Sequence, residues 1–192
     1  LLTLMRKEFE TIDLRETQPG DYEQVRSMLA AVSRFLRGID CKQDPQLVVR
    51  LQDLFLVLDH LRRLSHRCDE FERLKAVGHD PVLGSYASQV RNEIEGVLAT
   101  LESVKLKQQQ RSSKKLVEDF EHNKERDRRQ LSESVVRGDI DHEEALERLD
   151  ALRWLRRISF HLWRITRHLR HSRFDYEIQV EKPKQTHEIE VQ

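Results

Sequence analysis

The sequence predicts an all-α protein with six helices and a polar tail, and three observations support this prediction. Leucine and isoleucine recur at steps of three and four over two long segments, the spacing of one buried helix face. Asp-Pro pairs and isolated glycines, which are typical helix boundaries, divide the chain at intervals. Apolar and polar residues alternate, as in a strand, only in a short segment near the end.

The starts of three helices are predicted from residues that can cap a helix N-terminus. Asp44 and Asp80 each precede a proline, and proline suits the first helical position because its missing N–H has no partner there in any case. Asp141 is followed three positions later by Glu144, the spacing of a capping box. These signals place helix starts near residues 45, 81 and 142.

The helix ends are predicted from glycines, because glycine adopts the left-handed conformation of a C-terminal cap at little cost. Gly38, Gly78 and Gly138 lie where such caps are expected. The resulting helices cover residues 2–16, 21–37, 45–77, 81–108, 112–137 and 142–172.

Two of these segments carry a continuous apolar stripe and should bury one face along their whole length. In the third helix the stripe comprises Leu47, Leu51, Leu54, Leu58, Leu61, Leu64 and Cys68. In the sixth helix it comprises Leu152, Leu155, Ile158, Leu162, Ile165 and Leu169. The helix over 112–137 is polar nearly all round, which predicts either an exposed helix or a surface for a partner.

The tail, residues 173–192, is polar and is predicted to be disordered. Residues 176–180 alternate between apolar and polar side chains, which is the period of a strand. A lone strand has no partner in a helical domain, so strand exchange in a homodimer is the alternative to disorder.

The two striped helices also share a short motif, which indicates an internal repeat. Residues 58–65 and 152–159 both read LxxLRR followed by Leu or Ile and then Ser, and an Arg-Gly pair precedes each copy. The repeat predicts two tandem three-helix units, over residues 1–78 and 79–172.

Two such units, with this motif in each third helix, resemble the PhoU family. The second copy is similar to the PhoU-like domain at the C-terminal end of sodium-dependent phosphate cotransporters. The resemblance implies a cytoplasmic regulatory domain attached to the inner (plasma) membrane, which modulates phosphate transport. Because the chain begins with Leu1, we expect the transporter's membrane domain upstream in the same polypeptide. A free-standing helical interaction module is the alternative.

The motif departs from the PhoU pattern at the metal-binding positions, where the family has two acids four residues apart. Those positions hold Arg62 and His66 in the first copy, and Arg156 and Phe160 in the second. Two cations in place of carboxylates would repel a metal ion, so no metal site is predicted. An anion or a partner is expected instead.

The candidate residues for anion or partner contact are arginines, whose planar donor fork suits phosphate and carboxylate groups. They are Arg62, Arg63, Arg156, Arg157, Arg164 and Arg167. The competing interpretation is that Arg153, Arg157, Arg164 and Arg167 pair with acids on the helix over 112–137. Nucleic-acid binding is less favoured, because the total charge of 34 basic and 34 acidic residues gives no general attraction to it. Contact with a membrane surface stays open.

No catalytic motif or cofactor site is predicted, and the chain is not expected to be an enzyme. The sequence contains no Gly-rich phosphate loop, nucleophile elbow or HExxH motif. Cys41 and Cys68 have no nearby Cys or His partners and are interpreted as reduced thiols. The longest apolar run, over residues 54–58, is much too short to cross a bilayer.

Overall fold

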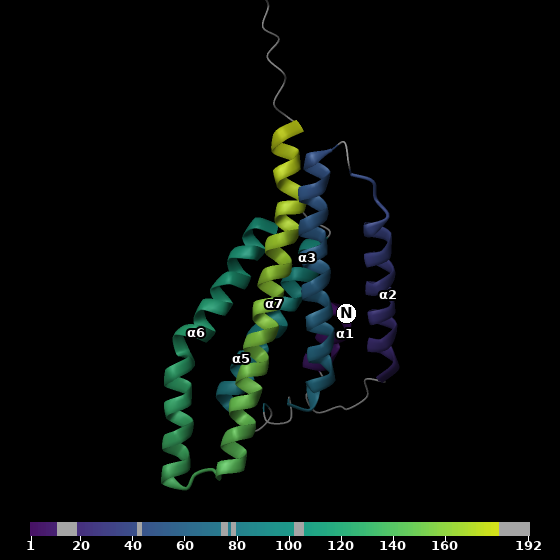
Figure 1. The fold of residues 1–192 in the computed structure, drawn as a ribbon. Coiled ribbons are helices and arrows are strands. Elements are labelled where there is room, and N and C mark those ends of the chain that lie inside the picture. The colour runs from purple at the N-terminus through teal and green to yellow at the C-terminus, as the bar shows by residue number, and fades with distance from the viewer. Residues whose placement is uncertain (11–18, 42–43, 74–76, 78–79, 102–105, 181–192) are drawn as a thin grey trace, which may run out of the picture.

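The protein is almost entirely helical in the part of the chain that its computed structural model describes, residues 1–10, 19–41, 44–73, 77, 80–101 and 106–180 (Figure 1). The helices are α1 (Leu2–Glu10), α2 (Pro19–Arg37), α3 (Pro45–Arg67), α5 (Pro81–Leu101), α6 (Leu106–Arg137) and α7 (His142–Val180), with a short 3₁₀ helix, η1 (Cys68–Arg73), after α3. No strand occurs among these residues. The predicted all-α class is therefore confirmed.

The predicted starts of α3, α5 and α7 are confirmed, and each is capped as expected. The Asp44 carboxylate accepts from the backbone N–H of Gln46 at 2.9 Å, and the Asp80 carboxylate from that of Val82 at 2.7 Å. The Asp141 carboxylate accepts from the N–H of Glu144 at 2.8 Å. These bonds satisfy N–H groups that have no partner inside the helix.

The α6 end follows the predicted glycine cap. Gly138 has a φ of 77°, and the backbone N–H of Asp139 bonds to the carbonyl of Ser134 at 2.9 Å. With the bond from the Gly138 N–H to the Val135 carbonyl, at 3.0 Å, this forms a Schellman motif. α2 also ends where predicted, but Gly38 is not left-handed, so the cap predicted there is wrong in form. Gly78 lies outside the described residues.

Replacing Gly138 with alanine is expected to destabilise the protein by about 1 kcal/mol, because a Cβ disfavours the left-handed backbone. Gly38→Ala is the matched control, since its backbone is not left-handed and its new Cβ would lie no closer than 3.4 Å to a neighbour. Urea unfolding of both variants measures the difference. Equal losses would contradict a conformational role for Gly138.

Some predicted boundaries are wrong. The third helix was expected to reach residue 77, but α3 ends at Arg67 and Glu70 in η1 has non-helical angles. The Arg67 carbonyl, which a continuing helix would use, instead accepts from the Trp154 indole at 2.9 Å. α5 ends at Leu101 rather than 108, and α6 begins at Leu106 rather than 112.

The C-terminal prediction also needs correction. α7 continues to Val180, so residues 173–180 are helical, whereas the sequence predicted disorder there, with a strand over 176–180 as the alternative. Extending an existing helix avoids the cost of a new nucleus, whereas a strand of five residues has no neighbour to pair with. Residues 181–192 lie outside the described part, as do residues 11–18 of the predicted first helix.

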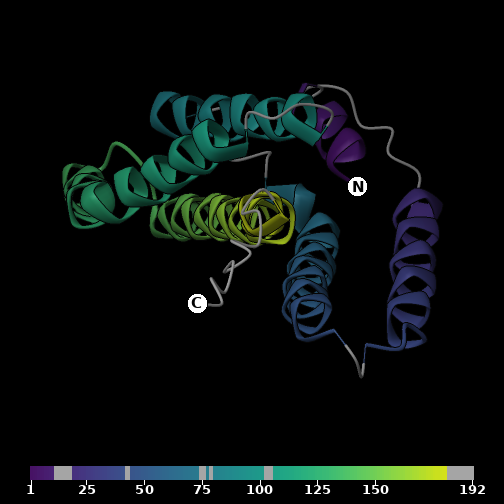
Figure 2. The ribbon, with the colours of Figure 1, turned by 90° about the horizontal axis from the view of Figure 1, so that it is seen from above.

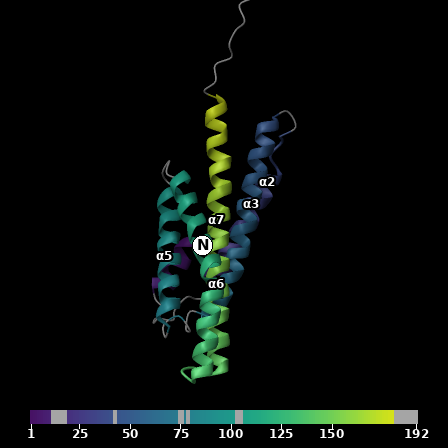
Figure 3. The ribbon, with the colours of Figure 1, turned by 90° about the vertical axis from the view of Figure 1, so that its left-hand side faces the viewer.

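α7 is the central helix of the molecule. It packs against α3 on one side and against α5 and α6 on the other, as the views in Figures 1 and 3 agree. α2 packs against α3 at the edge, well away from α5 and α6 (Figure 2). α1 lies against α5.

Two hydrophobic clusters hold this arrangement together, and both predicted stripes enter them. The larger cluster joins α1, α3, α5, α6 and α7, and contains the whole stripe of α7. The stripe of α3 divides, because Leu51 and Leu58 pack against α2 whereas Leu64 and Cys68 enter the larger cluster. Since residues of both predicted units share the larger cluster, the division at residue 78 remains a prediction.

α3 and α7 run antiparallel and meet at steps of seven residues. Asp53 lies against His168, His60 against His161, and the Arg67 carbonyl against Trp154. A step of seven is the repeat that keeps the same seam of two helices in contact. These three contacts join α3 to α7 from Asp53 to the end of α3 at Arg67.

Candidate functional site

Four of the six predicted arginines occupy equivalent positions in the two motif copies, and the six do not form a single site. Arg62 and Arg156 are half-buried, whereas Arg63 and Arg157, the next residue in each copy, are exposed. Ser65 and Ser159, which close the motifs, are fully buried in both copies. The last four positions of the motif therefore have the same burial on α3 and on α7.

The competing interpretation, in which Arg153, Arg157, Arg164 and Arg167 pair with acids of α6, is wrong for all four within the described residues. Arg153 pairs within its own helix, with Asp150 at 2.8 Å. The α7 arginine that does meet an acid of α6 is Arg156, which lies 3.1 Å from Glu121 and was not among the four. Within the described residues, Arg157 has no carboxylate at ion-pair distance. Arg63 pairs with Asp59 on α3 at 2.8 Å.

Arg164 and Arg167 form a separate group around an aromatic ring. Their guanidinium carbons lie 5.7 Å and 6.0 Å from the centroid of the Trp163 ring, which is cation–π distance. Arg164 also donates from Nε to Nε2 of His60 at 3.3 Å. Neither arginine has a carboxylate partner among the described residues.

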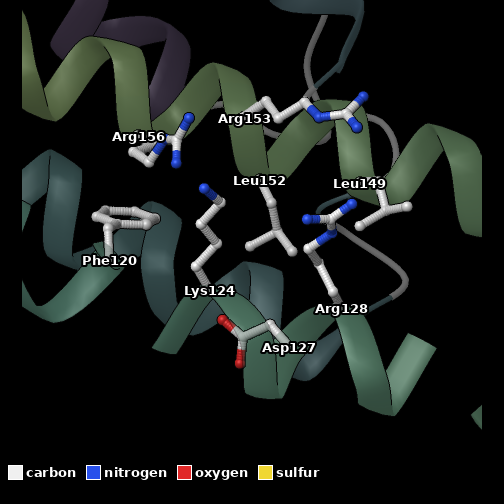
Figure 4. Close-up of a pocket in the computed structure, with 8 residues that line it drawn as sticks. All are labelled: Phe120, Lys124, Asp127, Arg128, Leu149, Leu152, Arg153 and Arg156. Carbon is white, nitrogen blue, oxygen red and sulfur yellow. The ribbon is translucent and has the colours of Figure 1, made fainter. Parts of the chain in front are cut away.

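A pocket of about 260 Å³ lies between α6 and α7 and brings cations of both helices together (Figure 4). Its lining residues are Phe120, Lys124, Asp127, Arg128, Leu149, Leu152, Arg153 and Arg156. Pockets for drug-sized molecules are typically roughly 300–1,000 Å³, so this volume suits a smaller ligand. Of the predicted arginines, it includes Arg156.

Asp127 is the one carboxylate among these lining residues, and its hydrogen-bond partners are two residues that do not line the pocket. Asp127 is 5% exposed, and it accepts from the Tyr86 hydroxyl at 2.7 Å and from Nη2 of Arg126 at 3.1 Å. Burial, the hydrogen bond and the Asp127 charge together raise the pKa of Tyr86 to about 12, so the hydroxyl stays protonated as the donor.

The pocket's four cations are only weakly compensated. Arg128, Arg153 and Arg156 each have a carboxylate neighbour, but those carboxylates are largely exposed and screened by water. Lys124 has no carboxylate at ion-pair distance in the described chain, and Figure 4 shows it between Phe120 and Leu152. The pocket therefore offers an excess of positive charge and several N–H donors, which suits a multivalent anion such as a phosphate group.

Sequence reasoning missed three of these four cations as site residues: Lys124, Arg128 and Arg153. A signal was present, because Phe120, Lys124 and Arg128 follow one another at steps of four and must share one face of a helix. This spacing did not stand out in the sequence, because the other faces of the same helix are charged as well.

A buried histidine cluster lies on the opposite side of α7, at the seam with α3. Nδ1 of His60 and Nδ1 of His161 are 3.2 Å apart, and His168 bonds through Nδ1 to Asp53 at 2.7 Å. Burial lowers the pKa of His60 and of His161 to about 4, with the charge of Arg164 adding to the effect on His60 and that of His60 to the effect on His161. The neutral state fits the geometry, because His60 Nε2 must accept from Arg164.

These histidines are hydrogen-bonded side chains of the bundle, and the described residues hold no group of three or more His, Cys, Asp or Glu arranged for a metal ion. Nor does any described helix have the length and apolarity that a membrane span requires.

Comparison of the chain with protein-family models, with characterised proteins and with solved structures found no match.

Proposed function

We propose that this chain is a helical regulatory domain that binds a phosphate-class anion in the pocket between α6 and α7. The single observation that supports the proposal is the meeting of Lys124 and Arg128 from α6 with Arg153 and Arg156 from α7. In the full proposal the domain lies on the cytoplasmic side of the inner membrane and modulates a sodium-dependent phosphate transporter in the same polypeptide. That target rests on the PhoU resemblance of the two motif copies.

Charge repulsion between α6 and α7 would couple anion binding to the distance between these two helices. Without an anion, the cations of α6 and of α7 repel one another across the pocket, because water only partly screens them. A bound anion removes this repulsion and favours closer approach of the two helices. α7 also packs along α3 at steps of seven residues, so a shift of α7 would reach the far side of the molecule. The proposal assigns no catalytic step and no cofactor to the chain.

Removing two of the pocket cations is expected to weaken anion binding strongly. We expect Lys124→Ala combined with Arg156→Ala to raise the Kd for pyrophosphate at least about 100-fold, because each substitution removes a hydrogen bond to a charged group, worth about 1.5–3 kcal/mol. Isothermal titration at constant ionic strength measures the change.

The matched control is Lys107→Ala combined with Arg129→Ala, which removes the same charge from exposed positions of α6. This variant should bind within about twofold of the unaltered protein, since distant charges are screened at physiological salt. Equal weakening by both variants would show only general attraction of anions and would reject the pocket.

The regulatory part is tested in the complete transporter polypeptide. Sodium-dependent phosphate uptake should respond to phosphate on the domain's side of the membrane, and this response should be lost in the Lys124→Ala, Arg156→Ala variant. Anion binding without any such response would retain the pocket and reject the transporter as its target.

A further inference from the structure

The outward side of α7 carries a second cationic surface, separate from the pocket. It consists of Arg157, Phe160, Trp163, Arg164 and Arg167, which we call the arginine–tryptophan face. Steps of three and four residues place them along one side of the helix, over about 15 Å at a rise of 1.5 Å per residue. The pocket is instead lined by Leu149, Leu152, Arg153 and Arg156 of the same helix.

The charge of this face is not compensated within the described chain. Arg157, Arg164 and Arg167 have no carboxylate at ion-pair distance there. Arg153 and Arg156, which do meet an acid, line the pocket instead. An anionic partner is therefore the complement of this face.

Apolar side chains accompany the cations. Phe160 is 40% exposed, and its ring meets His60 of α3 at 6.2 Å, so the edge of α3 adjoins the face. On α3, Leu56 lies one turn before His60 and is 41% exposed, and Val49, seven residues earlier, is 60% exposed. Trp163 lies half-buried under the two arginines, with its indole N–H in no hydrogen bond.

We propose that the arginine–tryptophan face docks on an anionic phospholipid surface. Arginine beside exposed aromatic and aliphatic side chains is the combination that suits the headgroup level of a bilayer, where cations meet phosphate and apolar groups reach the acyl boundary. The exposed flank of a helix is convex, whereas a helical peptide is usually bound in a groove. Nucleic acid fits less well, because Arg164 and Arg167 already occupy the Trp163 ring on which a base would stack.

Sedimentation of the full chain with vesicles tests this proposal. The vesicles contain phosphatidylcholine alone or phosphatidylcholine with phosphatidylserine. We expect binding to the anionic vesicles only, lost as salt is raised, with a blue shift of tryptophan emission that Trp163→Phe removes. Replacing Arg157, Arg164 and Arg167 with alanine should reduce partitioning roughly 100-fold, because each basic residue near an anionic surface contributes about one factor of five.

Two control variants make the result specific. The first variant replaces three exposed α6 residues with alanine: Lys107, Arg111 and Arg129. It removes the same charge as the test variant and should leave partitioning nearly unchanged. The Lys124→Ala, Arg156→Ala pocket variant should also bind vesicles normally, so this proposal and the proposed anion pocket can fail separately. Absence of vesicle binding, equal loss in both triple variants, or saturable binding to single-stranded RNA instead of vesicles would overturn the lipid proposal.

Discussion

Replacing Trp154 with alanine is expected to lower the free energy of unfolding by about 3–5 kcal/mol, the usual cost of deleting a large aromatic side chain from a core. Trp154 is 1% exposed, and its ring stacks on Phe9 of α1 at a centroid distance of 5.8 Å. Its indole N–H donates to the Arg67 carbonyl at the end of α3. Loss of the ring therefore removes contacts with two other helices at once.

Urea unfolding followed by circular dichroism measures this effect. Trp154→Phe keeps most of the apolar contact but leaves the partly buried Arg67 carbonyl without its donor, so an intermediate loss of about 1–3 kcal/mol is expected. Phe35→Ala is the control, since that ring is 71% exposed and its loss should cost less than about 1 kcal/mol. An unchanged midpoint for Trp154→Ala would contradict its role as the junction of α1, α3 and α7.

Acid is expected to destabilise the protein between pH 6.5 and about 4. The pKa of His60 and of His161 falls from an ordinary 6.5 to about 4 in the folded chain, mainly because burial disfavours the charged form. The unfolded chain then binds more protons than the folded one in this window. Stability is therefore full above pH 6.5 and declines as the pH falls, by at most about 3 kcal/mol for each histidine.

The decline should depend on the cluster and not on histidine in general. His60→Gln combined with His161→Gln should flatten the dependence of unfolding free energy on pH over this window. The control His66→Gln changes an exposed side chain and should leave the slope unaltered. Asp53, Asp59, Arg63, Arg67, Arg164 and His168 also face the cluster and stay in place in both variants. Equal slopes in all three proteins would contradict the assignment.

The helical class and most helix starts could be predicted because their causes are local. An aspartate before a proline or a leucine stripe at steps of three and four acts within one turn of helix. The end of α3 could not be predicted this way, because Trp154, 87 residues later, takes the carbonyl that would continue the helix. The tail was misjudged for a similar reason, since the alternating pattern over 176–180 ignores the helix that precedes it.

The candidate site was predicted only in part. Arg156 was identified from the repeated motif, but its pocket neighbours Lys124 and Arg128 come from a helix whose charge is spread over all its faces. Only the packing of α6 against α7 shows which of those charges face a cavity. The separation of Arg164 and Arg167 into a different surface likewise depends on how α7 is rotated in the bundle.

The central claim, that an anion binds between α6 and α7, is tested most directly by soaking crystals of the protein with tungstate. Tungstate is an electron-dense mimic of phosphate, and its anomalous signal shows where it binds. The account predicts one dominant peak between α6 and α7, within hydrogen-bonding distance of at least two of Lys124, Arg128, Arg153 and Arg156. A pocket without signal, while tungstate is seen at Arg157, Arg164 and Arg167 or elsewhere on the surface, would contradict the proposed anion site.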